Sequence, residues 1–157
     1  MTLDRLRPVA DRLLDPVVAA AKRLGLTPDT VSVIAFALAV GAGVAFFQAE
    51  PGWYLAGAAL VFLNGWLDLL DGALARELQV DSAAGDLLDH VLDRYADVVV
   101  VAGLAGGIGQ YALGFAAVTG VLLTSYMGTQ IEAVGLDREY GGLLGRADRL
   151  ALIGFVG

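Results

Sequence analysis

Four aspartates at helical spacing are the residues of this chain best suited to chemistry. Asp68 and Asp71 stand three residues apart, and Asp89 and Asp93 stand four apart. On helices, each pair lies on one face, about one turn apart. Two facing helices would gather four carboxylates at one point, where their mutual repulsion favours a bound cation. Oxygen ligands in this number suit Mg²⁺, Mn²⁺ or Ca²⁺ better than zinc, so the spacing predicts a divalent-metal site.

The composition around these aspartates is that of a membrane protein. The 157 residues are 57% hydrophobic with a mean hydropathy of +0.70, which is too apolar for an ordinary soluble domain. The chain has no cysteine, which excludes disulfides and thiolate metal ligands. A net charge of −7 argues against a nucleic-acid partner.

The hydropathy pattern predicts an all-α integral membrane protein with a single domain over residues 1–157. Residues 3–24 have apolar side chains at helical spacing among many charges, which predicts an amphipathic helix in the membrane interface. The predicted transmembrane helices are 30–49, 53–70, 86–107 and 111–131, and 148–157 is too short to span and predicts a partial helix. Asp68 and Asp71 then lie at the end of one membrane helix. Asp89 and Asp93 lie within the next membrane helix or at its end, and ionisable groups at such positions are usually functional.

The distribution of basic residues predicts the orientation of these helices. With four spans, all ten lysines and arginines fall on the side of the N-terminus, and the opposite loops carry only Glu50 among charged residues. Because cytoplasmic loops are enriched in basic residues, this pattern predicts a multi-pass protein of the cell membrane with its N-terminus and carboxylates on the cytoplasmic side.

The spacing D-x2-D-G-x2-A-R-x8-G-x3-D-x3-D resembles the signature of the CDP-alcohol phosphatidyltransferase family. Its fixed positions are filled by Asp68, Asp71, Gly72, Ala75, Arg76, Gly85, Asp89 and Asp93. The resemblance implies a bundle of six membrane helices and a homodimer. Since the pattern shows four complete spans and a partial fifth, we expect the chain to be truncated at its C-terminus.

The resemblance also implies a reaction of phospholipid biosynthesis. A lipid phosphate passes from a CDP-lipid, either CDP-diacylglycerol or CDP-archaeol, to the hydroxyl of a polar alcohol, and CMP leaves. By resemblance, Asp68, Asp71 and Asp89 ligate two ions of Mg²⁺ or Mn²⁺, and Asp93 is both ligand and general base. The residues implied for CDP-lipid binding are Gly72, Ala75, Arg76, Ser82 and Gly85.

The acceptor is predicted from three arginines after the fourth span. Arg138, Arg146 and Arg149 could hold a phosphorylated alcohol, either inositol phosphate or glycerol phosphate. Residues 145–150 resemble the phosphate-contacting segment of the branch that uses inositol phosphate. The alternative is that these arginines only anchor the loop on the cytoplasmic side.

Two other classes of membrane protein also place carboxylates in helices. One is a prenyltransferase that acts on a prenyl diphosphate, although Gly65 follows Asn64 where that class has Asn-Asp. The other is a cation transporter with an intramembrane carboxylate site, although Arg76 beside the carboxylates would oppose the passage of cations. The product distinguishes the classes, because only the phosphatidyltransferase releases CMP.

Overall fold

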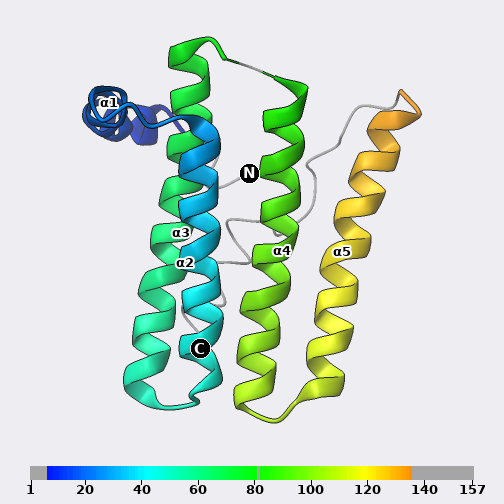
Figure 1. Ribbon diagram of the computed structural model, residues 1–157. Coiled ribbons are helices and arrows are strands. Elements are labelled where there is room, and N and C mark those ends of the chain that lie inside the picture. The colour runs from blue at the N-terminus through cyan, green and yellow to red at the C-terminus, as the bar shows by residue number, and fades with distance from the viewer. Residues whose placement is uncertain (1–6, 81, 136–157) are drawn as a thin grey trace.

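The protein is a bundle of long antiparallel helices (Figure 1). The computed structural model describes residues 7–80 and 82–135, and these stretches contain five α-helices and no strand. The helices are α1 (Arg7–Arg23), α2 (Pro28–Phe47), α3 (Pro51–Leu78), α4 (Ala83–Gly107) and α5 (Tyr111–Ala133). The prediction of an all-α protein is confirmed. Residues 3–6 and the helix expected over 148–157 lie outside the described residues.

Short, well-capped connections make the successive long helices antiparallel. The hydroxyl of Thr27 accepts a hydrogen bond from the backbone of Thr30, and Pro28 follows at the start of α2. Ser82 caps α4 in the same way, accepting from the backbone N–H of Gly85 at 3.0 Å. The helix α3 is followed by the C-cap residue Gln79, which has a left-handed backbone with φ of 53°. The start of α2, the end of α3 and the start of α4 therefore meet at the end of the bundle that carries α1 (Figure 1).

Helix α2 is central in the packing, because it contacts both α3 and α4, whereas α5 contacts α4 and α1 contacts α3. One core cluster lies at the α1 end and consists of Leu14, Val18, Ala21, Val31, Leu70 and Leu74. A second cluster comprises Ala39, Ala42, Phe46, Val61, Ala96 and Val100. The first cluster contains residues on either side of Asp71, so it fixes the end of α3 that carries the first carboxylate pair.

Glycines allow α2 and α4 to cross in backbone contact. A methyl group on Gly103 would meet the carbonyl oxygen of Gly43 and lie 2.6 Å from its Cα. A methyl group on Gly43 would lie 2.7 Å from the carbonyl oxygen of Val99. Neither position has room for a side chain, which is how membrane helices pack closely where hydrocarbon surrounds them.

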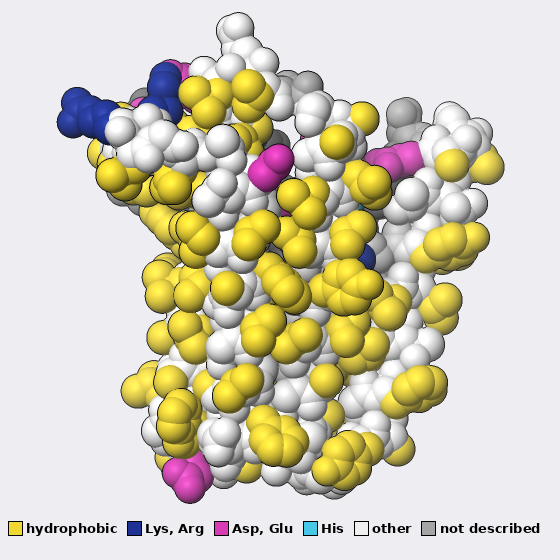
Figure 2. All heavy atoms as spheres, viewed as in Figure 1, with side chains coloured by type: hydrophobic (Ala, Val, Ile, Leu, Met, Phe, Trp, Pro, Cys, Tyr) yellow, Lys and Arg dark blue, Asp and Glu magenta, His cyan; other side chains and the backbone are white. Residues whose placement is uncertain are grey.

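Three of the described helices, α2, α3 and α5, are long and apolar enough to cross a membrane. Hydrophobic side chains cover the middle of the visible face, and most of its lysines and arginines gather near α1 (Figure 2). The predicted span over 86–107 corresponds to α4, which is not among the three. It carries five charged residues, Asp86, Asp89, Asp93, Arg94 and Asp97, and these lower its hydropathy.

Candidate metal centre and nucleotide pocket

Three of the four predicted carboxylates converge where α3 and α4 face each other. Asp68 and Asp71 come from α3 and Asp89 from α4, and each offers a carboxylate oxygen within 4.8 Å of the other two. Asp71 is buried, whereas Asp68 and Asp89 are half-buried. The sequence predicted that Asp93 would complete this cluster. Among the described residues Asp93 is not part of this group of three, although it stands one turn after Asp89 on α4.

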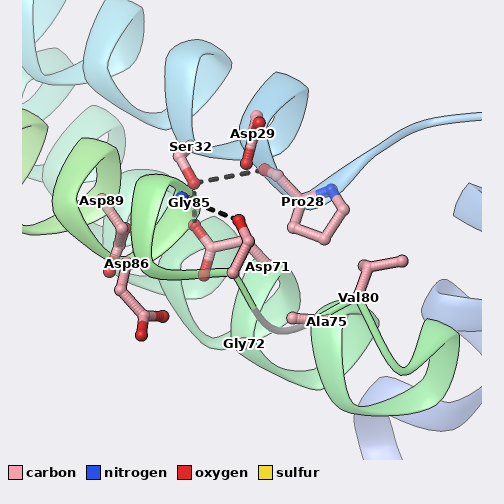
Figure 3. A pocket seen from close by; sticks show the side chains of 11 residues that line it. Pro28, Asp29, Ser32, Asp71, Gly72, Ala75, Val80, Gly85, Asp86 and Asp89 are labelled. Carbon is pink, nitrogen blue, oxygen red and sulfur yellow. Dashed lines mark hydrogen bonds between the residues drawn. The ribbon is translucent and has the colours of Figure 1, made fainter.

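The buried carboxylate is held by a serine of α2. The hydroxyl of Ser32 donates a hydrogen bond of 2.8 Å to Oδ2 of Asp71 (Figure 3). Ser32 is itself buried, with 6% of its surface exposed. Sequence reasoning missed this residue, because a single serine in an apolar helix has no spacing that relates it to an aspartate 39 positions away.

A pocket opens beside the carboxylates, between the starts of α2 and α4 and the end of α3 (Figure 3). Four of the five residues predicted to bind the CDP-lipid line it, namely Gly72, Ala75, Ser82 and Gly85. Its other lining residues are Pro28, Asp29, Ser32, Asp71, Val80, Asp86 and Asp89. The pocket is narrow at Gly85, where a methyl group would stand 3.1 Å from Oγ of Ser82 and 3.3 Å from Oδ1 of Asp29.

The fifth predicted residue, Arg76, lies near this pocket without lining it. Its Nη1 is 3.5 Å from the point that a methyl group on Gly72 would occupy, so the guanidinium folds back one turn along α3. Arg76 is exposed and also borders a hollow beside α1. The predicted acceptor residues Arg138, Arg146 and Arg149 lie outside the described residues.

Asp93 stands in a different environment from the three clustered carboxylates. Nη2 of Arg94 is 3.7 Å from Oδ2 of Asp93 and 3.4 Å from Oδ2 of the buried Asp97. Nη1 of Arg94 also donates a hydrogen bond of 2.6 Å to the hydroxyl of Ser125 on α5. Asp93 is thus connected to α5 through an arginine that the sequence did not single out as functional.

The clustered carboxylates fit a hard divalent cation. The three ligand groups all offer oxygen, which Mg²⁺ and Mn²⁺ prefer. Like charges at this separation repel one another unless a cation lies between them. Asp71 is also largely removed from water, which makes an uncompensated charge there costly.

The fold and the site together define a helical membrane protein with a carboxylate metal centre beside a pocket. Residues 25–155 match the family model of CDP-alcohol phosphatidyltransferases, and the chain belongs to this family. It is therefore a membrane-bound transferase, and the prenyltransferase and transporter interpretations are set aside.

Two relatives illustrate the similarity in sequence. Archaetidylinositol phosphate synthase of Methanothermobacter thermautotrophicus is 34% identical over 152 residues, which are 96% of this chain and 74% of the relative. Phosphatidylinositol phosphate synthase of Mycobacteroides abscessus is 36% identical over 149 residues, which are 90% of this chain and 66% of the relative.

Solved structures support the same family. The Mycobacterium tuberculosis phosphatidylinositol phosphate synthase with CDP-DAG bound has a TM-score of 0.76 and 32% identity, covering 92% of this chain and 74% of that one. The same enzyme in complex with manganese and citrate has a TM-score of 0.77, covering 90% of this chain and 70% of that one.

Proposed function

We propose that this protein transfers the lipid phosphate of a CDP-lipid to a hydroxyl of inositol phosphate and releases CMP. The observation that carries the proposal is the convergence of Asp68, Asp71 and Asp89 beside a pocket lined by the family's glycines. Relatives named as synthases of archaetidylinositol phosphate and phosphatidylinositol phosphate support inositol phosphate over glycerol phosphate. The donor is CDP-diacylglycerol or CDP-archaeol, since relatives of both lipid types are similar to this chain.

Asp68, Asp71 and Asp89 would hold Mg²⁺ or Mn²⁺, with two ions in the loaded site and Asp93 as a further ligand. When bound, these ions neutralise the diphosphate and stabilise the oxygen that leaves with CMP. Asp93 takes the proton from the acceptor hydroxyl, whose oxygen forms a bond to the phosphorus next to the lipid. The bond from this phosphorus to the oxygen of CMP breaks, which completes the transfer.

The pocket beside the carboxylates is the proposed site of the cytidine diphosphate group. Gly72, Ala75 and Gly85 leave room for it, and Arg76 supplies a charge-assisted contact to its phosphates. Ser82 stands at the start of α4, where the backbone N–H groups of a helix favour an anion. We assign the phosphate of the acceptor to Arg138, Arg146 and Arg149.

In the proposed orientation, the carboxylates and the N-terminus face the cytoplasm at the cell membrane, and the chain acts as a homodimer. The interfacial helix α1 lies on the same side as the pocket, and α4 crosses together with α2, α3 and α5. Two observations support this arrangement. Most basic residues of the visible face gather at the α1 end (Figure 2), and α4 packs against two of the apolar helices, α2 and α5 (Figure 1).

The test is release of CMP from a CDP-lipid by the protein in detergent with Mg²⁺ or Mn²⁺. Inositol phosphate, glycerol phosphate, serine and free inositol are supplied separately. We expect release with inositol phosphate only, abolished in Asp93→Asn and unchanged in Glu50→Gln at the opposite end of the bundle. Release with another acceptor would overturn the choice of substrate, and no release with any acceptor from folded, metal-loaded protein would overturn the proposed reaction.

A further inference from the structure

We propose that Ser32 is a positioning residue for the metal site, because its hydroxyl fixes the orientation of the Asp71 carboxylate. Ser32 belongs to α2, which contributes no carboxylate to the cluster. The inference rests on the proposed metal site and extends it to a third helix. It predicts that metal affinity depends on one hydroxyl group that does not itself touch the metal.

The geometry favours the carboxylate as the acceptor of the single hydroxyl proton. Oγ of Ser32 lies 2.8 Å from Oδ2 of Asp71 and 3.2 Å from the backbone oxygen of Pro28, one turn earlier (Figure 3). A hydrogen bond to a charged acceptor is shorter and about twice as strong as a neutral one. Ser32 and Asp71 are each 6% exposed, so water competes little for this bond.

Holding Oδ2 of Asp71 limits the rotation of the carboxylate and thereby sets the direction of its other oxygen. Without the hydroxyl, the carboxylate would be buried with one hydrogen bond fewer and could turn away from Asp68 and Asp89. Groups that only orient a metal ligand typically contribute about tenfold to hundredfold to metal affinity. We expect a loss of Mn²⁺ affinity in this range when the hydroxyl is removed.

A purely structural role is the competing explanation, because the same hydrogen bond joins α2 to α3. The chain contains a matched control for this role. Nδ2 of Asn64, on α3, donates a 2.8 Å hydrogen bond to the backbone oxygen of Ala35 on α2. Asn64 is buried as well, lies two turns before Asp71 and does not line the pocket. Loss of this hydrogen bond should weaken the contact between α2 and α3 without changing the orientation of the Asp71 carboxylate.

The experiment compares Ser32→Thr with Ser32→Val in the detergent-solubilised protein. Threonine and valine have nearly the same shape, so the two variants differ in the hydroxyl and not in volume. The dissociation constant for Mn²⁺ is measured without substrate by electron paramagnetic resonance. We expect Ser32→Thr to remain within about threefold of the original protein and Ser32→Val to bind roughly tenfold to hundredfold more weakly. Asn64→Leu should lower the unfolding temperature and leave the Mn²⁺ affinity unchanged.

A double-mutant comparison tests whether Ser32 acts through Asp71. In an Asp71→Asn background, the difference in affinity between Ser32→Thr and Ser32→Val should disappear, since the carboxylate that the hydroxyl orients is gone. If Ser32→Val does not fold, Ser32→Ala is used in its place, because alanine removes the hydroxyl without adding volume. Equal affinities in Ser32→Thr and the hydroxyl-free variant would overturn the positioning role, as would an equal loss in Asn64→Leu. No Mn²⁺ binding by the unaltered protein would instead overturn the metal site itself.

Discussion

The crossing of α2 and α4 should not tolerate one additional methyl group. In Gly103→Ala, the new Cβ would meet the carbonyl oxygen of Gly43 and stand 2.6 Å from its Cα. Carbon atoms in good contact are about 3.5–4.0 Å apart, so the helices must separate by roughly 1 Å. The neighbouring atoms belong to the backbone, which cannot rotate away as a side chain can.

The expected magnitude follows from a comparison with a second glycine. Overpacking typically costs about 1–3 kcal/mol. Replacing glycine by alanine inside a helix also gains up to about 1 kcal/mol from helix propensity. A methyl group on Gly120 of α5 would have no atom within 4 Å, so Gly120→Ala retains that gain without a clash. The propensity gain cancels between the two variants, and their stabilities should differ by the overpacking cost of about 1–3 kcal/mol.

The assay is thermal unfolding of both variants in the same detergent, followed by CMP release from the folded fraction. We expect Gly103→Ala to melt below the original protein and Gly120→Ala to melt at or above it. A separation at Gly103 also tilts α4, which carries Asp89, and a misplacement of about 1 Å at a catalytic centre can reduce the rate about a hundredfold. Equal unfolding temperatures for the two variants would refute the conclusion that the helices are in backbone contact here.

Three further predictions concern the site and its supports. Asp71→Asn and Asp89→Asn should each weaken Mn²⁺ affinity by more than about a hundredfold, which is the upper limit for a residue that only orients a ligand. Titration followed by electron paramagnetic resonance measures this affinity. Gly85→Ala should raise the KM for the CDP-lipid about tenfold, because the new methyl group would meet Ser82 and Asp29. Mn²⁺ affinity should stay within about twofold of the original value. An unchanged KM would show that Gly85 does not belong to the nucleotide pocket. Gln79→Gly should raise the unfolding temperature, because glycine adopts the observed φ of 53° with less strain, and a lower temperature would contradict this account.

Much of the helical layout could be predicted because it depends on local pattern. Runs of apolar residues and turn residues between them place α2, α4 and α5 within three residues of their observed ends. The end of α3 was predicted at residue 70 and is observed at Leu78. Hydropathy locates the point where a helix leaves the apolar region, whereas backbone hydrogen bonding decides where it ends. The segment after Asp71 is rich in alanine and leucine, which are strong helix formers, so α3 continues.

The candidate site could be predicted only as far as its residues share a spacing. The pairs Asp68 with Asp71 and Asp89 with Asp93 indicated a metal site from the sequence alone. The contacts of Ser32 with Asp71 and of Arg94 with Ser125 could not be predicted in this way, since they join residues 39 and 31 positions apart. Such contacts depend on the register of one helix against another, which hydropathy does not fix.

The contacts of Ser32 with Asp71 and of Arg94 with Ser125 connect the site to two different helices, α2 and α5. Asp71 is oriented from α2, through a buried hydroxyl that carries no charge. Asp93 lies beside Arg94, whose guanidinium is also bonded to α5. Nη2 of Arg94 lies 3.7 Å from Oδ2 of Asp93, so a change in α5 that moves this guanidinium would also act on that carboxylate. We therefore expect the packing of α2 to control metal affinity. The packing of α5 should control the direction of the Asp93 carboxylate, which we propose as the general base.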